Sequence, residues 1–284
     1  MKGLAGRRAV LATRHGKEAA IAPALAPLGV TVEVADVDTD AFGTFTGETP
    51  RPGDMLETAV AKARAGMAAT GADLGLASEG AFGGALAGFV ADARELIVLV
   101  DDAAQRVVHL VRAGLPSNQA SLVVEEVEAS VLTEFTRRVG FPGHGLVVFA
   151  EGADSGGGAV EEKGIVDTGR LAAAIERALA RSGVGRARIE TDMRAHLNPT
   201  RMARIAELAE DFASRLATPC PACGAWGYGP VDALRGLPCG DCGAATSLVR
   251  ELVHGCEVCG HREARPRDDG LTAADPQWCP LCNP

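Results

Sequence analysis

Eight cysteines in four Cys-x-x-Cys pairs are the residues whose type and spacing most clearly predict chemistry. A Cys-x-x-Cys turn presents two thiolates to one ion, and two such turns complete the tetrahedron that zinc prefers. The pairs therefore predict two structural Zn²⁺ ions, with iron or redox-active dithiols as the alternatives. The expected metal ligands are Cys220, Cys223, Cys239, Cys242, Cys256, Cys259, Cys279 and Cys282.

The spacing of these turns leaves their pairing open. Sequential pairing places 15 residues between the turns of the first site and 19 between those of the second, as is typical of zinc ribbons. A nested arrangement joins the two middle turns, 13 residues apart, and an interleaved cross-brace is the third possibility. We favour the sequential pairing. His254 and His261 are interpreted as bystanders, because eight cysteines already complete two sites.

The cysteine-rich segment, residues 218–284, has few large apolar side chains, so bound metal would replace a missing hydrophobic core. Its formal charge is −3 before thiolates and zinc are counted. Such a negative segment is a poor electrostatic match to the phosphates of nucleic acids. We expect a structural or protein-contacting module here, and we do not expect nucleic acid as a partner.

A second group of polar residues lies near the N-terminus, where a short apolar run meets a helical pattern. Thr13, Arg14 and Lys17 occupy this junction. Backbone N–H groups and cations at a strand-to-helix junction bind anions such as phosphate, although a solvated loop is the plainer interpretation. Glu79 follows a predicted strand in a glycine-rich apolar stretch, where a carboxylate is a suitable Mg²⁺ ligand.

Together these residues resemble the inosine-triphosphate pyrophosphatase-like superfamily of nucleotide-cleaning enzymes, which includes the non-canonical purine phosphatases. The superfamily's Thr-Asn-x-x-Lys motif corresponds to residues 13–17, and its Glu-Asn-Ala-x-x-Lys-Ala motif corresponds to residues 57–63. Its Asp-Asp-Ser-Gly motif falls on residues 77–80, where the Glu-Gly ending is closest to the purine phosphatases. The resemblance covers residues 8–85. The whole layout also resembles an uncharacterised bacterial family with a cysteine-rich tail.

The resemblance implies an α/β fold with a cleft for a nucleoside triphosphate and Mg²⁺, in which metal-activated water would hydrolyse the substrate. Under this resemblance the catalytic residues would be Glu57, Glu79 and Lys17. The phosphate-contacting residues would be Thr13, Arg14, Lys17 and Lys62. The sequence departs from the pattern at Arg14, where the superfamily has Asn, and at Ala77 and Ser78, where it has an acidic pair. Either Glu79 compensates for that pair, or the domain binds without cleaving.

A further cluster of charged residues, residues 190–201, precedes a helix that begins at Asn198-Pro199. Arg194, His196 and Arg201 are candidates to reach an anion or the cleft. The alternative is a surface turn in which Asn198 simply caps the helix.

The elements that would position these residues alternate between strands and helices, which indicates an α/β sheet covered on both faces. Strands are expected at residues 10–12, 30–34, 74–77, 95–100, 106–111, 145–149 and 186–191, and helices at 18–28, 55–70, 123–139, 168–182 and 199–216. We expect a mixed sheet flanked by helices, followed by a helical segment and a small double zinc-ribbon module. The expected boundaries are 1–151 for the α/β domain, 152–164 for a linker or insertion, 165–217 for a helical connector packing on that domain, and 218–284 for the zinc ribbons.

Composition narrows the function further. The formal charge of −9 disfavours a nucleic-acid-binding surface over the whole protein. Neither a secretory signal nor a membrane-spanning segment is recognisable, and the paired cysteines suit a reducing compartment, so we expect a cytoplasmic protein. Two functions compete. One is a Mg²⁺-dependent nucleoside triphosphate phosphohydrolase with a zinc-ribbon appendage, and the other is a non-catalytic zinc-ribbon adaptor or protein-interaction module that retains the fold.

Overall fold

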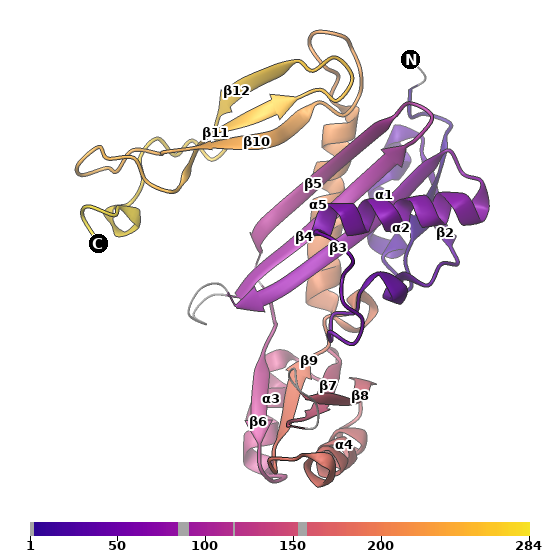
Figure 1. Cartoon of the computed structure of the whole chain (residues 1–284), viewed down its shortest axis with the longest axis vertical. Coiled ribbons are helices and arrows are strands. Elements are labelled where there is room, and N and C mark those ends of the chain that lie inside the picture. Colours follow the sequence, from indigo (N-terminus) through magenta and orange to yellow (C-terminus); the bar gives the residue numbers. More distant parts are fainter. Residues whose placement is uncertain (1–2, 85–90, 116, 153–157) are drawn as a thin grey trace.

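Three β-sheets, formed largely by successive stretches of the chain, organise the computed structural model, which describes residues 3–84, 91–115, 117–152 and 158–284 (Figure 1). The first sheet has the strand order β2-β1-β3-β4-β5. Its strands are β1 (Arg8–Ala12), β2 (Thr31–Ala35), β3 (Leu74–Gly84), β4 (Ala91–Asp101) and β5 (Arg106–Leu115). β1 runs parallel to β2 and β3, whereas β3, β4 and β5 are antiparallel, so the sheet is mixed as expected.

Helices cover both faces of this first sheet. The helices are α1 (Glu18–Leu25), α2 (Met55–Thr70) and α5 (Pro199–Ala217). Side chains alternate across a strand, so Leu76 and Ile97 face α1 and α5, whereas Ala77 and Val98 face α2. Gly75 permits the close approach of α2, because a Cβ atom there would lie 2.7 Å from the carbonyl oxygen of Ala63.

The second sheet has the order β6-β9-β7-β8 and is antiparallel throughout. Its strands are β6 (Ser121–Val124), β7 (Leu146–Ala150), β8 (Ala159–Ile165) and β9 (Ala187–Thr191), and its helices are α3 (Ala129–Val139) and α4 (Thr168–Arg181). Phe135 of α3 and Ile175 of α4 pack on one core with Val148 and Ile189 of the sheet. Residues 117–192 therefore form a unit with its own core.

This division of the chain differs from the expected one. The sheet changes near residue 116 rather than 151, and residues 123–139, expected as one helix, contain the end of β6 and all of α3. The expected linker contains most of β8, although its residues 153–157 lie outside the described residues. The sequence of this strand is polar, which is why it was interpreted as a linker. In the structure its residues Glu161 and Glu162 are stabilised by ion pairs with Arg177 of α4. Of the expected helical connector, α5 and Ala195 just before it pack with the core of the first sheet, whereas α4 packs on the second.

The third sheet is formed by β10 (Gly229–Arg235), β11 (Val249–Gly255) and β12 (Arg262–Pro266), which are antiparallel. It follows α5 and extends away from the first sheet, with the C-terminus near its far end (Figure 1). Short 3₁₀ turns occur at η1 (Ala26–Leu28), η2 (Thr39–Phe42), η4 (Ala195–Leu197) and η5 (Pro276–Trp278). No helix in the described parts of the chain has the length and apolar character needed to cross a bilayer.

Candidate functional site

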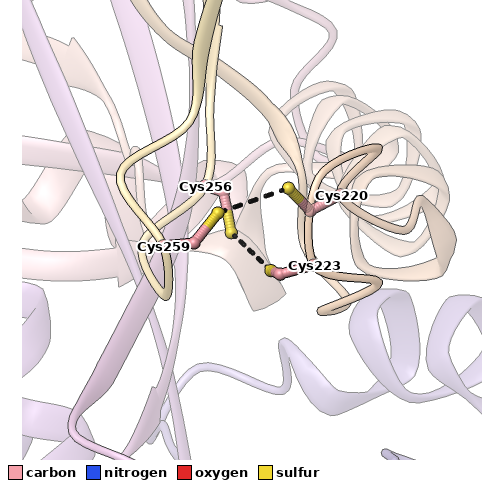
Figure 2. Close-up of side chains that lie close together, drawn as sticks. All are labelled: Cys220, Cys223, Cys256 and Cys259. Carbon is pink, nitrogen blue, oxygen red and sulfur yellow. Dashed lines mark hydrogen bonds between the residues drawn. The ribbon is translucent and has the colours of Figure 1, made fainter.

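The eight cysteines form two groups of four, and within each group the sulfur atoms all lie within 4.8 Å of one another. Cys220, Cys223, Cys256 and Cys259 form the first group (Figure 2), and Cys239, Cys242, Cys279 and Cys282 form the second. Sγ–Sγ separations in the two groups include 3.7 Å and 3.6 Å, far too long for disulfides. Four sulfurs bound about 2.3 Å from one ion would lie about 3.8 Å apart, so the groups have the size of tetrahedral metal sites.

The pairing of the turns is interleaved, so the sequential pairing that we favoured is wrong in this structure. The reason is the antiparallel sheet, in which Gly229 of β10 lies opposite Gly255 of β11. The turn before β10 and the turn after β11 consequently meet at one end and form the first group. β12 then returns the chain toward the opposite end, where the turn after β10 meets the last turn. The number of residues between the cysteine turns does not reveal that the chain reverses direction at each strand, so the spacing alone could not predict this pairing.

Each Cys-x-x-Cys turn is closed by its own backbone. The N–H of Gly224 donates to the carbonyl oxygen of Cys220, and Gly243 and Gly260 repeat this contact at the second and third turns. These three glycines have φ angles of 71–72°, the left-handed region that favours glycine. The first cysteine of each pair is buried and the second is exposed.

The first cysteine group is fixed to the first sheet by two arginines. Arg106 of β5 lies 3.5 Å from the ring centroid of Trp226 and donates to the carbonyl oxygen of that residue. Arg215 of α5 donates to the carbonyl oxygens of Gly227 and Pro230, at 3.3 and 2.8 Å. The second group lies at the other end of the third sheet, away from these contacts.

A cleft with a volume of about 370 Å³ lies between the first and second sheets. The first sheet supplies the β1–α1 junction, the loop before α2 and the middle of β3, and the second sheet supplies residues of β8 and β9. Among the described residues that line it, the cationic ones are Lys17, Arg51, Lys62, Lys163, Arg194 and Arg201, and the acidic ones are Asp40, Glu79 and Glu190. Cations thus outnumber carboxylates in a protein whose overall charge is negative.

Lys17 is buried at the wall of this cleft. Its ammonium group donates to the carbonyl oxygen of Ser78 at 3.0 Å, and it forms no ion pair with any residue in the described ranges. Burial, and next the charge of Arg201, lower the pKa of Lys17 to about 8. Burial likewise lowers the pKa of the neighbouring His15 to about 3, so that imidazole is neutral at physiological pH. The His15 ring stacks on His196, with the ring centroids 5.2 Å apart.

Glu79 is held between two cations. One of its carboxylate oxygens accepts a hydrogen bond from Lys62, and the other lies 3.4 Å from Arg51. Because both oxygens face cations, and Ala77 and Ser78 supply no carboxylate, this donor set does not fit a Mg²⁺ site. Within the described ranges, the only groups of three or more potential metal ligands are the two cysteine groups.

The segment of residues 190–201 contributes to the cleft, as one of its two interpretations anticipated. Arg194 and Arg201 line the cleft, and His196 reaches it through its contact with His15. Arg201 is buried and forms an ion pair with Glu95 of β4 at 2.6 Å. The other interpretation also describes real contacts, since Asn198 caps α5 and Asp192 pairs with Arg194 at 2.6 Å.

Of the residues expected near the N-terminus, the structure brings Thr13, Lys17, Lys62 and Glu79 together in the cleft. Glu57 lies elsewhere, because its side chain accepts a hydrogen bond from the N–H of Asp54 in the capping box of α2. Arg14 is exposed and pairs with Asp38 at 2.7 Å. Sequence reasoning missed Arg51 and Lys163, which belong to a loop and to the expected linker and carry no motif.

The fold and the site define a mixed-sheet α/β protein with a cationic cleft and a cysteine-rich C-terminal module. The family described as a domain of unknown function, DUF6671, matches residues 62–284, and the chain belongs to this family. No curated protein and no solved structure shows a significant match. The match begins within α2, so it includes the cysteine groups but not the β1–α1 junction.

Proposed function

We propose that this protein binds a phosphate-bearing small molecule in the cleft and two structural zinc ions in the cysteine groups. The observation that carries the proposal for the cleft is the convergence of six cationic side chains on one cavity, against three carboxylates among the described lining residues. Lys163, Arg194 and Arg201 also pair with Glu48, Asp192 and Glu95, which do not line the cavity. Cations clustered in a concave, partly desolvated site attract anions more strongly than the same charges spread over a surface.

The condition of individual cations supports a phosphate ligand. Lys17 has no carboxylate partner within the described ranges, so the protonated fraction of this amine adds uncompensated positive charge to the cleft. An anion could displace the carboxylate partners of Arg51 and Lys163. The contact of Arg51 with Glu79 is long, at 3.4 Å, and Glu48, the partner of Lys163, is half exposed. The cleft volume falls within the range of small-molecule sites. The resemblance near the N-terminus suggests nucleoside triphosphates as the first ligands to test.

Binding is better supported than Mg²⁺-dependent hydrolysis, because Glu79, the one buried carboxylate among the described residues that line the cleft, already faces Lys62 and Arg51. Titration calorimetry with ATP, inosine triphosphate and inorganic pyrophosphate, each with and without Mg²⁺, tests the proposal. Arg51→Ala should weaken binding about tenfold, the effect of losing one charge-assisted hydrogen bond. Arg170→Ala removes a surface ion pair of α4 and serves as the matched control. If none of the three ligands binds, the cleft proposal is wrong. If a ligand is hydrolysed during the titration, the protein is an enzyme rather than a binding protein alone.

The proposal for the cysteine groups rests on their tetrahedral dimensions. Thiolate sulfur is the ligand set of structural zinc sites, and four sulfurs per ion leave no open position for catalysis. A reducing compartment such as the cytoplasm would keep the ligands available. Elemental analysis of purified protein should give about two zinc ions per chain, and serine substitution of two cysteines in one group should reduce this to about one. A zinc content near zero in protein isolated without chelators would refute the assignment.

A further inference from the structure

Lysine is rare in this chain, and one lysine stands apart from the others. The chain contains Lys2, Lys17, Lys62 and Lys163, although Lys2 lies outside the described residues. Lys62 forms an ion pair with Glu79, and Lys163 forms one with Glu48. Lys17 is the one lysine in the described ranges without a carboxylate within ion-pair distance, and it is also buried.

The charged groups around Lys17 come from four elements. Lys62 of α2 and Arg201 of α5 oppose its positive charge, whereas Glu79 of β3 and Glu95 of β4 favour it. Both carboxylates are already committed, since Glu79 pairs with Lys62 and Glu95 with Arg201. The balance of burial and these charges leaves the pKa of Lys17 near 8, so a substantial fraction of its amine is neutral at physiological pH.

The residue that accepts the hydrogen bond of this amine also carries an unpartnered hydroxyl. The hydroxyl of Ser78 is buried and has no hydrogen-bond partner among the described residues, and Ser78 lines the same cleft as Lys17. The carbonyl oxygen of Ser78 is the group to which Lys17 donates. A buried hydroxyl without a partner is costly, so a ligand that hydrogen-bonds it would relieve this cost. The oxygen of a carbonyl compound attacked by Lys17 would be one such group.

We propose that Lys17 is a nucleophilic amine and that the ligand of the cleft is a phosphate-bearing aldehyde or ketone, with which Lys17 forms an imine. This inference rests on the proposed anion-binding function. The nitrogen lone pair of neutral Lys17 would attack the carbonyl carbon, and the carbonyl π electrons would move to oxygen, which takes up one of the two nitrogen protons to give a carbinolamine. The hydroxyl group then leaves with the second nitrogen proton as one water molecule, and the nitrogen electron pair forms the C=N bond. The cleft cations would hold the phosphate during these steps, and no oxidant or reductant is consumed.

The test uses the full-length, zinc-containing protein and pyridoxal 5′-phosphate, a probe that carries both an aldehyde and a phosphate. Imines formed at neutral pH are reduced with borohydride, and the modified lysine is identified by peptide mass spectrometry. Labelling of Lys17 should exceed that of Lys163 at least about tenfold, because the amine of Lys163 is held in an ion pair with Glu48, whereas Lys17 has no carboxylate partner in the described ranges. Pyridoxal, which lacks the phosphate, should label Lys17 at least about tenfold less, and pyrophosphate should compete with the phosphorylated probe.

Two variants complete the design. Lys17→Arg keeps the positive charge but cannot form an imine, so labelling of the protein should fall to the level of the remaining lysines. Lys2→Arg removes a primary amine elsewhere in the sequence and is the matched control. Thermal melting of both variants checks that they fold. If Lys17→Arg does not fold, the site-resolved labelling of the unchanged protein still decides the question.

The outcomes separate this inference from the function on which it rests. If nucleotides or pyrophosphate bind but the probe labels the lysines evenly, the imine proposal is overturned and anion binding stands. If Lys17 is labelled equally by pyridoxal and its phosphate, and no anion binds, both the phosphate-bearing ligand class and the proposed cleft function are overturned. Selective, phosphate-dependent labelling of Lys17 that pyrophosphate suppresses supports both.

Discussion

At the scale of single residues, the cleft depends on a buried ion pair between Arg201, which lines the cleft, and Glu95, which does not. Arg201 and Glu95 are 8% and 2% exposed, and Arg201 also donates to the carbonyl oxygen of Met193. This arginine therefore connects β4 of the first sheet to the segment that follows β9 of the second. The sequence indicated that Arg201 was a candidate to reach an anion. The structure gives it a counter-ion and a positioning role in addition.

Removal of one partner should leave the other charge buried and unpaired. We expect Glu95→Gln to lower the free energy of unfolding by about 3 kcal/mol, the effect typical of breaking a buried ion pair. The double variant Glu95→Gln/Arg201→Met should lose less than the two single losses added together, because no unpaired charge remains. Urea unfolding measures all three. Strictly additive losses would show that the two side chains act independently.

His15 should make stability depend on pH. Its folded-state pKa is about 3 against an ordinary value of 6.5, with burial as the main cause and the charge of Lys17 next. Below pH 6.5 the unfolded chain binds a proton that the folded protein excludes, so stability falls as the pH falls. Between pH 7 and pH 5 this one group should cost about 2 kcal/mol. His15→Gln should lack this part of the decline in urea titrations, and an unchanged decline would show that His15 is not the responsible group.

At the scale of elements, much of the fold could be predicted because local signals were strong. Residues 55–70 were expected as a helix and form α2, whose capping box and terminal Gly71 are local signals. β8 could not be predicted, because its glutamates are stabilised by arginines of α4 that a window of neighbouring sequence does not contain. The cleft could be predicted only in part. Lys17 and Glu79 belong to sequence motifs, whereas Lys163 reaches the site through β8, the strand that was not predicted.

Variants at the start of α2 can show whether Glu57 stabilises this helix or belongs to the ligand site of the cleft. The structure assigns this side chain to the start of α2, where it accepts a hydrogen bond from the backbone of Asp54. Asp54→Ala should therefore cost about 1 kcal/mol of stability, as loss of an N-cap typically does. Glu57→Gln should keep the cap, because glutamine also serves in a capping box, and should leave anion binding in the cleft unchanged. If calorimetry shows that Glu57→Gln abolishes nucleotide binding, Glu57 belongs to the ligand site after all.

At the scale of the whole molecule, α5 connects the two proposed sites. Arg201 lies near its N-terminal end at the cleft, and Arg215 lies near its C-terminal end, where it donates to the backbone beside the first cysteine group. Among the described residues, the second cysteine group has no comparable connection, and it is joined to the rest through the third sheet. The two groups therefore have the same four ligand types, but only the first is expected to stabilise α5 and β5.

The inequality can be measured by hydrogen exchange. Cys220→Ser should loosen the first group and with it the C-terminal turn of α5 and the edge strand β5, since Arg215 and Arg106 contact that group's backbone. Exchange there should accelerate at least about tenfold. Cys239→Ser should accelerate exchange only in the far part of the third sheet. Equal effects of the two substitutions on α5 would contradict this division of roles.

The position of α5 in the sequence also constrains the order in which the chain can fold during synthesis. The face of the first sheet that contains Leu11 and Ile97 is covered by Ile205 and Phe212. A ribosome must therefore complete the entire second sheet before the helix that closes the first one emerges. Until then a nascent chain exposes the part of this apolar sheet face that α1 does not cover, and the independent core of residues 117–192 is free to form first. For this protein, the last part of the first domain to be made is also the part that joins it to the cysteine-rich tail.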